Sequence, residues 1–76
     1  MTEQEWLNRF GEKLVDIMDD ECLTQKDFAK ETGLSVGIIS EYVNKRKMPT
    51  IKTILRLSYT FDIDVAELID FGDEIH

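Results

Sequence analysis

The feature that most constrains the fold of this chain is the short step from Gly33 to Ser35. Glycine often ends a helix because it enters the left-handed conformation without strain, and serine is among the best residues to begin one. Only Leu34 lies between these two signals. Thr24 is another good start signal, and it predicts a helix over residues 25–32. Two short helices should therefore meet across a tight turn.

Start signals and apolar spacing predict three more helices. Thr2 followed three residues later by Glu5 has the spacing of a capping box at the start of the chain. Asp64 and Glu67 repeat that spacing before a short last helix, and Thr50 should cap the helix before it. The residues expected to face the core are Trp6, Leu7, Phe10, Leu14, Ile17, Met18, Phe28, Ala29, Ile38, Ile39, Tyr42, Val43, Ile51, Ile54, Leu55, Leu57, Ser58, Phe61, Val65, Leu68 and Ile69.

No stretch of useful length alternates in the manner of a β-strand, so the fold class should be all-α with five helices. A chain of 76 residues can build one hydrophobic core and has no room for a second domain. We therefore expect one compact domain over residues 1–71, followed by an acidic tail at residues 72–76.

Several kinds of chemistry lack the residues that they need. The single cysteine, Cys22, allows no intramolecular disulfide, which suits a reducing compartment. The single histidine, His76, has no metal-ligand partner nearby and cannot complete a catalytic nucleophile and base set. No apolar run is long enough to span a membrane. We expect a cytoplasmic protein that is not an enzyme and that uses no metal, cofactor or small-molecule ligand.

The charge is distributed unevenly. The formal net charge of −7 would repel nucleic acid, but residues 24–56 carry seven bases against three acids, a net +4. Residues 1–23 carry −5 and residues 57–76 carry −6. One basic segment thus lies between two acidic ones, and it contains the two short helices.

Two helices joined by a short turn that contains glycine have the geometry of a helix-turn-helix, whose second helix enters a DNA major groove. Ala29, four residues before the glycine, is small enough to let the helices approach. The run TQKDFAKETGLSVGIISEYVNKRKMPT, from Thr24 to Thr50, resembles the Cro and lambda-repressor-like (XRE-type) helix-turn-helix family. The helices before and after the run also match that family's five-helix domain.

The resemblance implies a sequence-specific regulator of transcription, a repressor of bacterial or phage origin, that binds double-stranded DNA as a homodimer. This chain departs from the family at two positions. Val43 stands where the family often has glutamate, and Lys45 where it often has glycine. The end of the third helix is therefore expected to differ in shape.

The expected DNA contacts fall into two groups. Helix N-termini and basic side chains bind phosphate, whereas side chains on the exposed face of the third helix reach the bases. The phosphate candidates are Gln25, Lys26, Asn44, Lys45, Arg46, Lys47 and Lys52, and the base-facing candidates are Ser35, Val36, Gly37, Ser40 and Glu41.

Other interpretations remain open at this level. The basic run could simply complement the carboxyl end of the third helix. Glu41 could accept a hydrogen bond from a cytosine amino group, or could simply be solvated or pair with Lys45 four residues on. The whole domain could be a protein-interaction module, antitoxin-like or anti-repressor-like, whose acidic flanks dock on a basic protein. For a dimer, we expect the contact at the fourth and fifth helices and Phe71.

Overall fold

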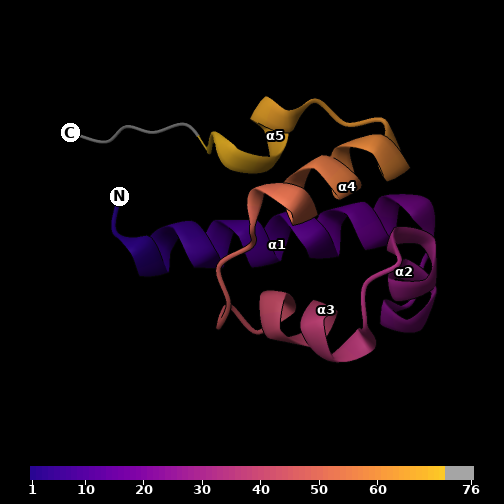
Figure 1. Cartoon of the computed structure of the whole chain (residues 1–76). Helices are drawn as coiled ribbons and strands as arrows, with labels where there is room; N and C mark the ends of the chain where they lie inside the picture. Colours follow the sequence, from indigo (N-terminus) through magenta and orange to yellow (C-terminus); the bar gives the residue numbers. More distant parts are fainter. Residues whose placement is uncertain (72–76) are drawn as a thin grey trace.

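The computed structural model describes residues 1–71, which form five α-helices and contain no strand in that range (Figure 1). The all-α prediction is therefore confirmed, and the proposed tail at residues 72–76 lies outside the described residues. The helices are α1 (Glu3–Glu21), α2 (Gln25–Thr32), α3 (Val36–Val43), α4 (Ile51–Phe61) and α5 (Val65–Ile69).

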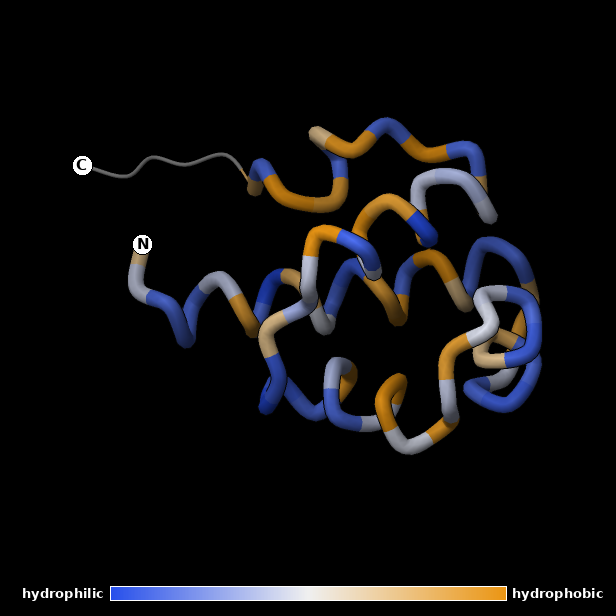
Figure 2. Tube along the Cα trace, in the orientation of Figure 1, coloured by the Kyte–Doolittle hydropathy of each residue, from blue (hydrophilic) through white to orange (hydrophobic). Residues whose placement is uncertain are grey.

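The long helix α1 runs through the middle of the molecule. In Figure 1, α3 lies on one side of α1 and the pair α4 and α5 lies on the other, while α2 closes one end. Helix α1 packs against α3 and α5, and α2 packs against both α3 and α4. This arrangement buries one face of each helix. Figure 2 shows hydrophobic and hydrophilic residues alternating along each helix, as expected for helices with one buried face.

All five helices contribute to a single core. The largest side chains that are fully buried are Phe10, Leu14, Phe28, Ile39, Leu57 and Leu68. Aromatic rings join separate helices: Phe28 stacks on Phe61 at 5.1 Å between ring centroids, and Phe10 meets the edge of Tyr42 at 5.5 Å. Such pairs add about 0.5–1.5 kcal/mol to the free energy of unfolding beyond their buried area.

The helix ends follow the predicted signals at most positions. Thr2 and Glu5 form the expected capping box, and the hydrogen bond from the Thr2 backbone N–H lowers the pKa of the Glu5 carboxyl. The second predicted box is wrong. The Asp64 side chain accepts from Ala66 N–H at 3.4 Å, and the Glu67 carboxylate lies 3.8 Å from the Lys13 ammonium.

Three residues assigned to the core face solvent instead. Ile51, Leu55 and Ile69 are 77%, 46% and 44% exposed. The main helix neighbours of α4 are α2 and α5, and its buried residues are Thr53, Ile54 and Leu57. The Tyr42 hydroxyl of α3 also reaches Thr53 Oγ1, at 3.3 Å.

Phe71 also differs from expectation. The sequence leaves it free for a dimer contact, but its ring packs 5.4 Å from Trp6, whose indole N–H donates to the Ile69 carbonyl at 3.0 Å.

Gly11 marks the closest approach between α1 and α3. It is buried inside α1, and a Cβ at this position would lie 2.8 Å from the Tyr42 carbonyl oxygen and 3.2 Å from that of Val43. Both of these atoms are backbone, so neither can turn away. The glycine therefore allows the last turn of α3 to rest directly on the α1 backbone.

Replacing Gly11 with alanine should lower the free energy of unfolding by about 1–2 kcal/mol. Overpacking costs about 1–3 kcal/mol, and the better helix propensity of alanine returns up to about 1 kcal/mol. Urea denaturation measures the change. Gly37→Ala is the matched control, because its Cβ would meet nothing nearer than Ser35 Oγ at 3.9 Å. That variant should gain about 0.5–1 kcal/mol, and equal shifts in the two variants would contradict the packing role of Gly11.

Candidate nucleic-acid interface

The turn between α2 and α3 is closed by local hydrogen bonds. Gly33 has φ +77° and its N–H donates to the Ala29 carbonyl at 2.8 Å, which ends α2 in the left-handed geometry expected of glycine. Ser35 then begins α3, and its Oγ accepts from Ile38 N–H at 3.1 Å. Buried Ala29 lets the two helices pack closely, as the sequence predicted.

Arg56 fastens this turn from outside the motif. Its guanidinium Nη1 donates to the Thr32 carbonyl at 3.2 Å. A Cβ at Gly33 would lie 2.7 Å from the same nitrogen, so glycine also leaves room for the arginine. Sequence reasoning did not find this role, because Arg56 and Thr32 are 24 residues apart. Helix α4 is therefore bonded directly to the end of α2, at the start of the turn.

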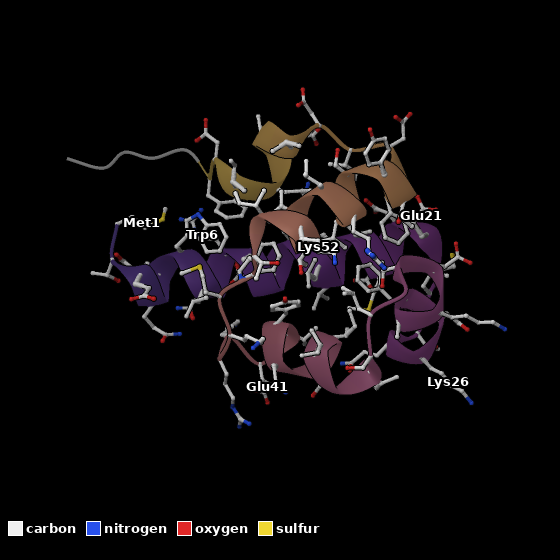
Figure 3. All side chains as sticks on the ribbon, in the orientation of Figure 1. Met1, Trp6, Glu21, Lys26, Glu41 and Lys52 are labelled. Atoms are coloured by element: carbon white, nitrogen blue, oxygen red, sulfur yellow. The ribbon has the colours of Figure 1, made fainter. Side chains whose placement is uncertain are left out.

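The outer side of α3 is uncovered within the described chain. Ile39 and Tyr42 turn into the core, whereas Val36 is 46% exposed and Gly37 has open space where a Cβ would lie. Figure 3 shows Glu41 directed away from α1, on the outer side of α3. The five base-facing candidates thus gather over the exposed turns of one helix.

Two polar candidates at the end of α3 are already bonded to each other. The Asn44 amide nitrogen donates to the Ser40 carbonyl at 2.9 Å and lies 3.2 Å from Ser40 Oγ. Both side chains keep a polar atom on the surface, but this contact restricts their orientation. Any base or phosphate that they touch must fit the conformation set by this pair.

The start of α2 is suited to a phosphate. Its first residues have N–H groups without acceptors in the helix, and these lie at the positive end of the helix dipole. Gln25 is half-buried there, and Lys26 points outward (Figure 3). Thr24 Oγ1 accepts from Asp27 N–H, while the Thr24 backbone N–H donates to the Asp27 carboxylate and lowers its pKa. This capping box leaves the N–H groups of Gln25 and Lys26 as the free ones.

Two members of the basic run form ion pairs. Lys45 Nζ lies 4.0 Å from Glu12 of α1, and Arg46 Nη1 lies 3.9 Å from Glu41. The expected alternative partner of Glu41, Lys45, is therefore wrong. Such exposed pairs contribute only about 0–1 kcal/mol each, so a phosphate can replace the carboxylates.

The remaining basic candidates form no ion pair within the described residues. Lys26, Lys47 and Lys52 are exposed and form no ion pair within residues 1–71. They lie on α2, on the loop after α3 and on the first turn of α4. Three segments that precede or follow α3 in the chain thus each carry an exposed lysine.

Lys45 takes the conformation that glycine usually supplies. Its φ is +64°, its N–H donates to the Tyr42 carbonyl, and Arg46 N–H donates to the Glu41 carbonyl, both at 3.0 Å. This is the hydrogen-bond pattern of a Schellman motif. The prediction that α3 would end in a different shape is therefore wrong. The chain keeps the glycine-type ending and accepts strain at a lysine.

Helix α1 also holds the loop in place. The Gln4 amide nitrogen donates to the Lys45 carbonyl at 3.2 Å, and Gly11 lies under the last turn of α3. Neither residue was identified from the sequence. A glycine inside an otherwise regular amphipathic helix was the available signal at position 11, since glycine is costly there without a packing reason.

A family model described as helix-turn-helix matches residues 23–68, which is more than half of the chain. The chain belongs to the Cro and lambda-repressor-like helix-turn-helix family. This family comprises DNA-binding regulators, and the helix-turn-helix of this member is the α2 and α3 pair. No curated protein and no solved structure matches the chain.

Two further properties of this helix-turn-helix protein hold for residues 1–71. None of the helices there is both long and apolar enough to cross a bilayer. In the same part of the chain, no three His, Cys, Asp or Glu side chains are grouped as a metal site would require.

Replacing Lys45 with glycine should make the domain more stable than replacing it with alanine. Both variants lack the ion pair with Glu12, but only alanine keeps a Cβ in the left-handed conformation. The difference should be about 1 kcal/mol in the free energy of unfolding. Thermal or urea denaturation of the two variants side by side measures it. Equal stabilities would show that the backbone at residue 45 carries no strain.

Proposed function

We propose that this chain is a transcriptional repressor, of the bacterial or phage kind, that binds a specific duplex DNA site as a homodimer with α3 in the major groove. The main support is the uncovered outer side of α3 from Ser35 to Gly37, directly after the helix-turn-helix turn. Gly37 is informative, because glycine inside a helix costs about 1 kcal/mol relative to alanine and nothing nearby in the domain requires it. A close approach of DNA base edges or of the DNA backbone to α3 would explain a glycine at this position.

The proposed DNA contacts fall into two groups, one that positions the domain on the duplex and one that recognises the base sequence. We assign phosphate contacts to the α2 start and to the basic side chains, which fix register and supply salt-dependent affinity. Base contacts fall to the outer side of α3, where Val36 can touch a thymine methyl group and Glu41 can accept from a cytosine amino group. The residues in the first group are Gln25, Lys26, Asn44, Lys45, Arg46, Lys47 and Lys52, and those in the second are Ser35, Val36, Gly37, Ser40 and Glu41.

Selection of bound sites from a random duplex pool tests the proposal directly. A dimeric reader should enrich pseudo-palindromic sites whose halves are separated by about one helical turn. The affinity for those sites should fall steeply with salt, because bound phosphates release counterions. A protein-interaction module that docks through its acidic flanks would enrich no sequence and would bind duplex DNA with no such slope.

Neutralising the basic loop with Lys45→Ala and Lys47→Ala should weaken binding to every duplex alike. The slope of log affinity against log salt should flatten by about one unit for each phosphate that the loop no longer neutralises. The preferred sequence should stay the same, because phosphate contacts carry no direct sequence information.

Lys13→Ala is the control for this loss of charge. Lys13 lies 3.8 Å from Glu67 of α5, on the side of α1 away from α3. Its removal should leave the salt slope nearly unchanged. If the loop variant and the Lys13 variant have the same slope as the parent, the loop does not contact phosphate.

Replacing Glu41 with alanine should raise affinity for random DNA and reduce sequence discrimination. A carboxylate near the groove is repelled by phosphates, and acceptance from a cytosine amino group compensates only at the right base pair. The expected loss of discrimination is about 1–3 kcal/mol at one position of the site. A base-substitution series with parent and variant measures it.

Arg46→Ala separates this reading role from the ion pair. Arg46 is the 3.9 Å partner of Glu41, and its loss should weaken all sites equally. If Glu41→Ala keeps the parent's preference at every base pair, then Glu41 serves only to hold Arg46.

A further inference from the structure

An apolar stripe follows the outer side of α4. Ile51, Leu55 and Tyr59 lie on successive turns of this helix and are 77%, 46% and 88% exposed. The opposite side of α4 already packs on the core through Ile54 and Leu57. Within the described residues the stripe is therefore left largely in contact with water, and three large apolar side chains in one row are costly to leave there.

The charges along α4 run from basic to acidic. Lys52 and Arg56 are its only charged residues, and both lie in its first two turns. Asp62 and Asp64 follow immediately after its last turn. Two copies of α4 placed side by side in opposite directions would therefore bring the basic end of each near the acidic end of the other.

The stripe also has a fixed relation to the helix-turn-helix. At 3.6 residues per turn, Lys52 lies about 60° and Arg56 about 100° around α4 from Leu55, the centre of the stripe. That flank faces the α2–α3 turn, because Arg56 reaches the Thr32 carbonyl from it. The direction toward the DNA-binding elements is thus nearly at right angles to the direction in which the stripe points.

We propose that the stripe of Ile51, Leu55 and Tyr59 is the surface through which two copies of this chain pair, with their α4 helices antiparallel. Leu55 of one copy lies against Leu55 of the other, and Ile51 lies against Tyr59 in both directions. A row with one member per turn matches itself when it is reversed about its central residue, as a two-fold interface requires.

The charge balance favours a second copy of this chain at α4 over pairing at α1. The described chain is acidic on α1, where Asp16, Asp19 and Asp20 are exposed, and pairing at that face would oppose like charges. Helix α4 has no acidic residue between Ile51 and Phe61. It is the helix on which two copies of a chain with net charge −7 can approach without carboxylates meeting in the contact.

This pairing fits the proposed function, on which its biological meaning rests. The symmetry axis of an antiparallel helix pair lies in the contact plane and perpendicular to both helices. The side of α4 that carries Lys52 and Arg56 points roughly along this axis. A two-fold rotation leaves that direction unchanged, so this side points the same way in both copies. Both helix-turn-helix motifs would therefore face one side of the dimer, where a single duplex can meet them.

Sedimentation equilibrium without DNA tests the pairing, across micromolar to millimolar protein. The parent chain should dimerise reversibly, and Leu55→Lys should weaken the dimer at least about tenfold while circular dichroism shows an unchanged helix content. Val15→Lys is the control, since Val15 is an exposed apolar residue of α1 away from the stripe. A monomeric parent, or a dimer that resists Leu55→Lys, would overturn the proposal and leave the stripe for a different partner.

Cross-linking gives a second, geometric readout. In a Cys22→Ser background, Leu55→Cys should form a disulfide-linked dimer on mild oxidation, because residue 55 meets itself across the axis. Val15→Cys in the same background should not. Equal cross-linking of the two variants would count against the antiparallel arrangement.

The two proposals can fail separately. Dimerisation through α4 with no DNA binding would remove the repressor function and leave the interface. Palindromic site selection that survives Leu55→Lys with undiminished affinity would leave the function and remove this interface.

Discussion

The contact between α1 and the last turn of α3 is the constraint on which the position of the helix-turn-helix depends. At Gly11 the α1 backbone lies against two carbonyl oxygens of α3, and Gln4 and Glu12 of the same helix hold Lys45 just beyond it. The recognition helix is therefore seated on the longest helix of the domain. Before the other end of α3, Arg56 of α4 bonds the Thr32 carbonyl, where α2 ends and the turn begins. The segments on both sides of a helix of only eight residues are thus held by residues outside the motif.

Much of this architecture could be predicted from the sequence because its signals are local. Caps at Thr2, Thr24 and Ser35 act over three residues, and the glycine at position 33 acts within its own turn, so each can be recognised without knowledge of the fold. The match of the family model over residues 23–68 agrees with the pattern found from these signals. The prediction was less successful for α4. Its apolar residues extend around more of the helix than the rest of the domain covers, and periodicity alone cannot tell the covered part from the exposed part.

In the candidate site, too, features set by local sequence could be predicted, whereas those set by contacts between distant segments could not. The sequence identified which residues lie on α3 and in the basic loop, because helical spacing sets their faces. It could not identify Arg56, Gly11 or Gln4, whose roles depend on contacts between distant segments. Nor could it choose the partner of Glu41. Arg46 lies beyond the helix end, and it comes near Glu41 only because Lys45 turns the chain into the left-handed conformation.

That left-handed lysine has two counterparts. Cys22 and Asp62, which end α1 and α4, have φ values of +58° and +53°. Each of these helices closes with a residue that bears a Cβ where glycine would be relaxed, at a cost of about 1 kcal/mol per position. Both positions are exposed, and neither lies on α2, on α3 or in the basic loop. Glycine at either position should therefore raise the thermal stability of the domain without altering α2, α3 or the basic loop, although at position 62 it also removes one of the acidic charges beside α4.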